Sequence, residues 1–299
     1  MKILTSSFSM DPSGVPTYTV TMVRAFEAFG HTVEVFSPEG GKLASQVTTH
    51  DNLLTLTPPD VILAQHTPCA YLLKSRFPDT PFIYSAHGYL PEIDQPPTGI
   101  RVDRWTAINE RVRSHLFEQG IELRNIDIVR DFVDLYQFST QTPLRPATPR
   151  VLFISNYKKW QNWTRLSKAC EILGYPLRAI GSPYGRSKDV AADINDADLV
   201  VSWGRGILEG MACGRAVMSF DKTFGDGYLT EAKYFESRRH QFSAEDCTGA
   251  GTVEWLVEQL SQYNPADGLR NRMLAETYHS PLLGAELLFH TMRAIGVSV

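Results

Sequence analysis

The fold is decided by the stretch Asp198-Leu-Val-Val-Ser-Trp-Gly-Arg-Gly-Ile-Leu-Glu-Gly-Met-Ala-Cys-Gly-Arg-Ala-Val-Met218. It predicts a buried strand over Leu199–Ser202, a glycine turn, a short helix that ends at Gly214, and a second strand over Ala216–Ser219. A glycine turn that leads into a helix presents unpaired backbone N–H groups and the positive end of the helix dipole. Such a turn is suited to hold a phosphate or a diphosphate.

The glycines of this turn allow two interpretations. Gly204 and Gly206 begin a pattern close to the dinucleotide-binding fingerprint G-x-G-x-x-G, but the third glycine, Gly210, comes one position late. One interpretation is that the turn binds the diphosphate of a ligand that also carries a sugar. Glu209, about one turn into the helix, would then accept a hydrogen bond from a hydroxyl of that sugar. The other is a helix–strand connection whose glycines only permit close packing. We expect the diphosphate ligand.

Length and composition limit the class of protein. The 299 residues suffice for two domains, and a net charge of −4 gives no overall field that attracts nucleic acid or anionic lipid. Nucleic acid is therefore not an expected partner, and any membrane contact would be peripheral. No apolar run approaches the ~18 residues of a membrane-spanning helix, and Met1–Ser9 lacks the pattern of a signal peptide. The four cysteines lack C-x-x-C spacing, which favours reduced thiols and a cytoplasmic location.

Short apolar strands alternate with helices along most of the chain, which is typical of an α/β fold with doubly wound parallel sheets. The expected strands are Lys2–Thr5, Thr32–Phe36, Asp60–Ala64, Pro81–Ser85, Arg104–Ile108, Ile126–Val129, Val151–Ile154 and Leu177–Ile180. The expected helices are Val15–Phe29, Cys69–Arg76, Glu110–Gln119, Trp163–Leu173 and one around Val190, with a wholly helical chain beyond Thr252.

A break in this pattern divides the chain in two. The segment Phe138–Arg150 has three prolines and no periodicity, as an interdomain linker does. We therefore expect Rossmann-like domains at 1–138 and 150–280, with a ligand in the crevice between them at the carboxyl ends of their sheets. We also expect a closing helix within 281–297 to pack back on the first domain.

Six segments resemble motifs of one known family and follow one another in that family's order. They are Ser13–Tyr18, Pro59–His66, Ile83–Gly88, Thr106–Arg113, Val129–Phe138 and Leu208–Val217. The chain thereby resembles the GT-B glycosyltransferases, in particular the retaining family 4, which take sugar from nucleotide diphosphates. The resemblance implies two Rossmann-like domains that face each other across a cleft. It also implies a UDP- or GDP-sugar held mainly by the second domain, and a glycan, lipid-linked or small-molecule acceptor held by the first.

The resemblance further implies roles for individual residues. His87 and Glu209 would be catalytic, with His87 reaching the transferred sugar and Glu209 binding the nucleotide ribose. The residues expected to bind the donor are Gly14, Asn156, Lys158, Lys159, Gly181, Ser182, Gly204, Arg205, Gly206, Ile207, Leu208 and Glu209. Amides at Gly206–Leu208 and nearby cations would stabilise negative charge on the diphosphate, so no metal and no cofactor is expected. For Gly181 and Ser182, an ordinary turn is an equal alternative.

Three positions depart from the family pattern. Asn156 stands where the family has an arginine, Gln161 where it has a lysine, and Val201 where it has the first of two paired glutamates. The leading hypothesis is a retaining glycosyltransferase of the hexosyltransferase kind. The departures keep open a GT-B module that binds a sugar nucleotide without transferring the sugar. A sugar-nucleotide epimerase and a phage-type enzyme that glycosylates modified DNA bases are further alternatives.

Other residues allow both a functional and a structural interpretation. His66 ends an expected strand and could face the ligand or pack in the core. Asp196-Ala-Asp198 is similar to a D-x-D metal motif, but its place before a strand favours a polar lead-in. The sequence contains no H-x-x-x-H pair, so zinc is not expected. Phe132 and Trp203 are expected to be packing residues.

Overall fold

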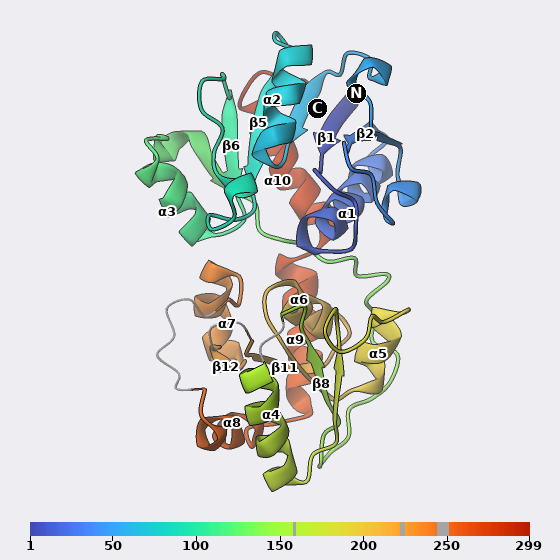
Figure 1. Cartoon of the computed structure of the whole chain (residues 1–299), viewed down its shortest axis with the longest axis vertical. Coiled ribbons are helices and arrows are strands. Elements are labelled where there is room, and N and C mark those ends of the chain that lie inside the picture. Colours follow the sequence, from blue (N-terminus) through green and yellow to red (C-terminus); the bar gives the residue numbers. More distant parts are fainter. Residues whose placement is uncertain (158–159, 222–224, 244–250) are drawn as a thin grey trace. The chain divides into compact units, whose positions relative to one another are not determined.

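The computed structural model describes residues 1–157, 160–221, 225–243 and 251–299. The chain forms two compact units: unit 1 is Met1–Phe132 together with Pro281–Val299, and unit 2 is Val133–Ser280. Figure 1 draws both, coloured from blue at the N-terminus to red at the C-terminus. The expected donor residues Lys158 and Lys159 lie outside the described residues. Within the described ranges, no helix is long and apolar enough to cross a lipid bilayer.

Unit 1 is built on a parallel sheet. Its described strands lie in the order β3-β2-β1-β4-β5-β6-β7. Their bounds are β1 Lys2–Ser6, β2 Thr32–Phe36, β3 Thr49–His50, β4 Val61–Ala64, β5 Phe82–Ala86, β6 Arg104–Ala107 and β7 Ile126–Ile128. The central strands β4 and β5 are wholly buried, as expected of a parallel sheet that is covered on both faces.

Helices cover both faces of this sheet. Their bounds are α1 Gly14–Ala28, α2 Thr67–Arg76, α3 Glu110–Glu118 and α10 Pro281–Arg293. Ile3 joins the core under α1 and α10, and the next residue, Leu4, joins the core under α2 and α3, because successive strand residues point to opposite faces. The red helix α10 packs on the blue helix α1 (Figure 1), where the rings of Phe26 and Phe289 stack with centroids 5.1 Å apart.

Unit 2 repeats this plan on a smaller sheet. Its described strands lie in the order β12-β11-β10-β8-β9, with only β12 antiparallel. The strands are β8 Val151–Ile154, β9 Leu177–Ile180, β10 Leu199–Ser202, β11 Ala216–Ser219 and β12 Gly227–Tyr228. The helices are α4 Trp160–Leu173, α5 Val190–Asp196, α6 Arg205–Ala212, α7 Glu231–Ser237, α8 Val253–Leu260 and α9 Ala266–Tyr278. Leu152 faces the core under α5, α6 and α9, and Phe153 faces the core under α4 and α8.

The proline-rich segment expected to link two domains packs on unit 2 instead. The N–H of Gln141 donates to Asn195 Oδ1 at 2.9 Å, and the N–H of Arg145 donates to Asp198 Oδ1 at 3.0 Å. The chain passes between the units at Phe132–Val133 and again at Ser280–Pro281. The contacts therefore divide the chain ahead of residue 138, and residues 139–149 are part of unit 2.

Each sheet reverses the direction of its strand order at one position. The reversal lies between β1 and β4 in unit 1, and between β8 and β10 in unit 2. Ser6 Oγ donates to the carbonyl of Gln65 at 2.8 Å in unit 1, and Ser202 Oγ donates to the carbonyl of Ile154 at 2.9 Å in unit 2. Ligands of such sheets bind outside the carboxyl ends of the two strands that flank the reversal. The loops that follow β1, β4, β8 and β10 are thus the places to look for a site.

Candidate functional site

The turn after β10 depends on a glycine. Gly204 has φ 57° and ψ −120°, a conformation that favours glycine because a Cβ would be strained there. Gly204 is the N-cap of α6, and the N–H of Ile207 donates to its carbonyl at 3.1 Å. The amides of Arg205 and Gly206 precede this bond, at the positive end of the helix dipole. Among the amides expected to hold a diphosphate, that of Ile207 is thus already engaged by the turn itself.

Two glycines let α6 lie close on the sheet. A Cβ on Gly206 would collide with the side chain of Ser202, and a Cβ on Gly210 would lie 2.9 Å from Val217 Cγ1. The close-packing role of both glycines is therefore confirmed. It is compatible with a ligand at the helix N-terminus, because the first N–H groups of a helix point along its axis, beyond its first turn. The diphosphate itself stays a prediction.

Arg205 and Glu209 form an ion pair on α6. Arg205 Nε lies 3.3 Å from Glu209 Oε1, and the two side chains are only 10% and 13% exposed. Burial raises the pKa of Glu209 because it disfavours the carboxylate, and the neighbouring Arg205 opposes this shift. A cation at the start of a helix can bind phosphate oxygens, and a carboxylate can accept hydrogen bonds from hydroxyl groups.

The loops after β8 and β9 bring three of the predicted donor residues together. Asn156 Oδ1 accepts a hydrogen bond from the N–H of Ser182 at 3.0 Å. Gly181 has φ 121°, and a Cβ there would collide with the carbonyl of Ser155, so this turn requires glycine. Asn156, Gly181 and Ser182 therefore lie side by side at the carboxyl ends of neighbouring strands. Their role in binding a donor stays a prediction.

An aromatic pair lies at the same carboxyl ends. The rings of Tyr157, after β8, and Trp203, after β10, have centroids 5.7 Å apart. Tyr157 is 42% exposed and Trp203 is half-buried. The sequence did not single out Tyr157, because a lone tyrosine after a strand carries no motif. The ring contact of Trp203 agrees with its expected packing role.

The remaining departures from the family pattern have contrasting environments. Val201 is fully buried inside β10, so its side chain contributes to the core and does not reach the carboxyl ends. Gln161 is exposed in the first turn of α4. Of the positions that differ from the family, Gln161 and Asn156 are thus accessible, and Val201 is not.

Gly14 and His87 belong to unit 1. Gly14 is the first residue of α1, and a Cβ there would have no neighbour within 4 Å. His87 follows β5, with its Nδ1 4.0 Å from Asp131 Oδ1 and its ring edge-on to that of Tyr18 at 4.6 Å. The His87 side chain is 6% exposed. A histidine, a carboxylate and a tyrosine ring therefore meet at the carboxyl end of the sheet. Sequence reasoning missed Asp131, which precedes the expected packing residue Phe132.

His66 contacts residues of two other loops of unit 1. It has φ 62°, an uncommon conformation for a residue with a Cβ, and its Nδ1 accepts a hydrogen bond from the N–H of Phe8 at 3.0 Å. Its Nε2 lies 3.7 Å from Asp94 Oδ1. Burial lowers the pKa of His66 to about 4 and raises the pKa of Asp94 to about 6. Asp94 was not predicted, and its only sequence signal is the long interval between two expected strands.

The D-x-D stretch has a structural role. Asp198 is 1% exposed, and its carboxylate accepts hydrogen bonds from the N–H groups of Arg145 and Arg150 at 3.0 and 2.8 Å. The interpretation as a polar lead-in to a strand is confirmed. In the described part of the chain, no three or more His, Cys, Asp or Glu side chains are grouped so that they could hold a metal ion. Metal independence stays a prediction.

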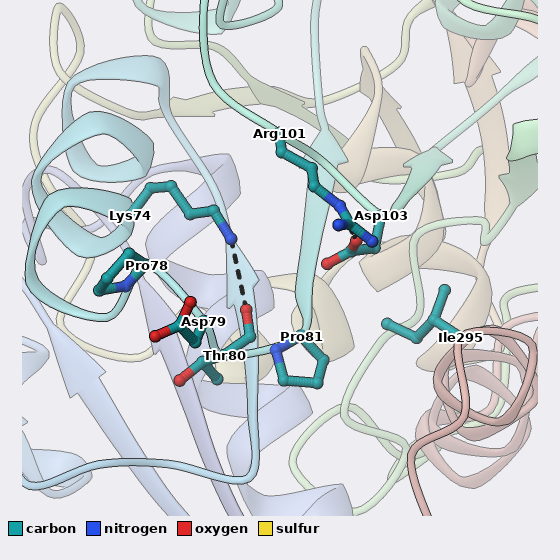
Figure 2. Close-up of a pocket in the computed structure, with 8 residues that line it drawn as sticks. All are labelled: Lys74, Pro78, Asp79, Thr80, Pro81, Arg101, Asp103 and Ile295. Atoms are coloured by element: carbon teal, nitrogen blue, oxygen red, sulfur yellow. Dashed lines mark hydrogen bonds and ion pairs between the residues drawn. The ribbon is translucent and has the colours of Figure 1, made fainter.

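A surface pocket lies at the other end of the unit 1 sheet (Figure 2). Thr80 and Pro81 precede β5, Asp103 precedes β6, and Lys74 reaches from α2 to donate to the carbonyl of Thr80 at 3.4 Å. Arg101 and Asp103 pair within it, with 2.8 Å between Nε and Oδ1. Because these residues stand at the amino ends of the strands, the pocket is separate from the candidate site.

Comparison with known proteins identifies the fold. No family model and no curated protein sequence matches the chain. Among solved structures, HepE from Anabaena in complex with UDP superposes with a TM-score of 0.69 at 15% identity, over 98% of this chain and 100% of HepE. WaaG, a glycosyltransferase involved in lipopolysaccharide biosynthesis, superposes with a TM-score of 0.62 at 14% identity, over 95% of this chain and 99% of WaaG. An α-glucosyltransferase in complex with UDP and a 13-mer DNA superposes with a TM-score of 0.64 at 10% identity, over 98% of this chain and 99% of the α-glucosyltransferase.

These solved structures are GT-B glycosyltransferases, and the likeness to them is one of fold. It extends over nearly the whole chain, so it includes both doubly wound units and their order in the sequence. The chain therefore has the GT-B fold of the glycosyltransferases, as its sequence motifs indicated.

Proposed function

We propose that this protein is a retaining glycosyltransferase of the hexosyltransferase kind, which uses a UDP- or GDP-sugar as donor. Unit 2 binds the donor at the carboxyl ends of β8, β9 and β10. Unit 1 binds the acceptor, which is a glycan, a lipid-linked sugar or a small molecule. The observation that carries the proposal is the glycine-capped N-terminus of α6 at the strand-order reversal, with Arg205 and Glu209 paired beside it. The complex of HepE with UDP supports the class of donor.

In this proposal the predicted donor residues of unit 2 have different tasks. Arg205 and the first amides of α6 bind the diphosphate, and Glu209 accepts hydrogen bonds from the ribose hydroxyls. Asn156 and Ser182, which are already joined by a hydrogen bond, lie beside the nucleobase.

The proposed reaction exchanges one bond for another on the same face of the sugar. The bond between the anomeric carbon and the diphosphate oxygen breaks, and the bond to the acceptor oxygen forms. The proton of the acceptor hydroxyl passes to the leaving diphosphate. Positive charge from Arg205 and the helix amides stabilises the negative charge that grows on the leaving group. His87 contacts the transferred sugar and positions it.

A thermal-shift screen of nucleotides and nucleotide sugars tests the donor. A nucleotide present at 100 times its dissociation constant stabilises the folded state by about 2.7 kcal/mol, which is easily detected. Transfer from an isotope-labelled donor, with and without acceptor, then separates the alternatives. Binding without transfer or hydrolysis would favour a non-catalytic module, and conversion of the donor alone would favour an epimerase. If no nucleotide stabilises the protein, the proposal fails.

A modified base in DNA is the second candidate acceptor. The structural neighbour bound to UDP and a 13-mer DNA that contains an HMU base favours it. The net charge of −4 weighs against a large DNA-binding surface. A gel-shift assay on duplex DNA at low salt decides between the two acceptor classes, because phosphate contacts are strongest there.

A further inference from the structure

Two titratable side chains at the carboxyl ends of the unit 1 strands have no task in the proposed reaction. His66 follows β4, and Asp94 ends the short 3-10 helix Glu92–Asp94 in the loop after β5. The 3.7 Å between His66 Nε2 and Asp94 Oδ1 exceeds hydrogen-bond distance. A Cβ on Gly88 would lie 2.6 Å from Asp94 Oδ2. The carboxylate thus fills the space that a side chain at position 88, next to His87, would occupy.

The hydrogen bond at Nδ1 of His66 determines which ring nitrogen carries the proton. A neutral imidazole carries one proton, and Nδ1 of His66 accepts a hydrogen bond from the N–H of Phe8. The proton is therefore on Nε2, the nitrogen nearer Asp94. With a pKa of about 4, His66 is neutral at pH 7, and with a pKa of about 6, Asp94 is largely ionised there. At neutral pH the pair offers one N–H donor and one charged acceptor, without a second charge.

Hydrogen bonds of neighbouring residues fix the loop that carries Asp94 and the ring of His66. The loop that carries Asp94 is anchored by Gln95, whose Oε1 lies 3.1 Å from His115 Nε2, and by Thr98, whose N–H donates to Tyr71 Oη at 2.9 Å. The bond from Phe8 fixes the ring of His66. Both groups are therefore preorganised at a separation that a single oxygen atom can bridge.

We propose that His66 and Asp94 together bind one hydroxyl group of a neutral, hydroxyl-bearing acceptor. The hydroxyl accepts a hydrogen bond from His66 Nε2–H and donates one to the carboxylate of Asp94. This inference rests on the proposed function and adds the chemical class of the group that unit 1 recognises.

The chemistry of the pair selects for a hydroxyl. A hydroxyl both donates and accepts, so it matches one donor and one acceptor at once. A phosphate or carboxylate would be repelled by Asp94, and an ammonium group would face the N–H of His66 with no lone pair to offer. Burial of the Asp94 carboxylate is costly, and a hydroxyl donor offsets part of that cost.

Binding to the wild-type protein gives the first test. The ring nitrogens of His66 are followed by ¹⁵N NMR while neutral methyl glycosides are added to the full chain. We expect saturable shifts at millimolar concentration, and at least tenfold weaker effects from glucuronate and glucose 1-phosphate. Unchanged His66 signals with every glycoside, or equal effects of neutral and anionic sugars, would overturn the inference.

Kinetics give the second test, once a transfer assay exists. Asp94→Ala is expected to raise the KM for the acceptor at least tenfold and to leave the KM for the donor and its hydrolysis rate within twofold. Asp103→Asn is the matched control, because this carboxylate stands at the amino ends of the same sheet. A variant that changes donor and acceptor KM equally would indicate a structural role and overturn the inference. If the wild type transfers no sugar, the proposed function fails, and the NMR titration still decides on the hydroxyl site.

Discussion

Arg205 and Glu209, four residues apart on α6, face each other with 3.3 Å between Nε and Oε1 and are almost withdrawn from solvent. The two charges are coupled, because each lies in the field of the other in a poorly solvated environment. In the proposed function, Glu209 binds ribose hydroxyls and Arg205 binds the diphosphate, so a substitution of Glu209 tests the first of these roles.

Glu209→Ala is expected to weaken the affinity for UDP about tenfold, the loss of roughly one hydrogen bond to a charged group. Isothermal titration calorimetry measures it. Glu276→Ala is the control, because Glu276 pairs with Arg272 at 2.6 Å on α9 with the same spacing. Equal affinities of the Glu209 variant and the wild type would remove Glu209 from the site.

His87→Ala is expected to lower kcat about 100-fold or more, with the donor affinity unchanged within twofold, because the proposed contact is to the transferred sugar. His290→Ala, an exposed histidine on α10 in the same unit, is the control. A normal kcat in the His87 variant would give this residue a structural role, through contacts such as those with Tyr18 and Asp131.

Gly210→Ala is expected to lower the free energy of unfolding by about 1–3 kcal/mol, because a methyl group does not fit between α6 and the sheet. Gly14→Ala, with open space around its Cβ, is expected to be neutral or to stabilise by up to about 1 kcal/mol. Urea denaturation of the two variants compares them directly. Equal stabilities would contradict close packing of α6.

Asp94→Asn is expected to stabilise the protein at pH 7.5 and to leave its stability unchanged near pH 3.5. Burial raises the pKa of Asp94 from 3.8 to about 6, so the wild type loses stability as the pH rises through this window. A shift of about two pKa units corresponds to roughly 3 kcal/mol, an upper value that the variant would regain at pH 7.5. Thermal denaturation at both pH values checks this. A gain of the same size at both would refute a titration effect.

Asp198→Asn is expected to destabilise unit 2 by about 2–4 kcal/mol, because the buried carboxylate accepts hydrogen bonds from two main-chain N–H groups and from the Arg145 guanidinium. Chemical denaturation with MgCl₂ and with EDTA measures the effect. Stabilisation of the wild type, but not of the variant, by Mg²⁺ would reverse the structural interpretation of the D-x-D stretch.

The buried strands were predictable because their pattern is dictated by burial on two faces. Thr32–Phe36, Val151–Ile154, Leu177–Ile180, Leu199–Ser202 and Ala216–Ser219 have the predicted bounds. The two-residue strands Thr49–His50 and Gly227–Tyr228 were not predicted, since so short a segment has no periodicity. Helix α7 was not predicted either, because its seven residues are too few to show a clear helical period and its Thr230 N-cap is a weak signal by itself.

The candidate site was only partly predictable. Its glycines could be predicted from the sequence, because positions such as Gly181 and Gly204 adopt backbone conformations that other residues avoid. The contacts of Asp94 with His66 and of Asp131 with His87 could not be predicted in this way, since they depend on the tertiary arrangement of the loops. The proline-rich segment was expected to be a linker, but it packs on unit 2. Prolines indicate irregular backbone and do not indicate what that backbone packs on.

The position of α10 has a consequence for biosynthesis. Its Phe289 and Gly284 complete the core that Phe26 and Phe132 begin, yet the whole of unit 2 separates these residues in the sequence. Unit 1 therefore completes its core only after the whole of unit 2 has been synthesised.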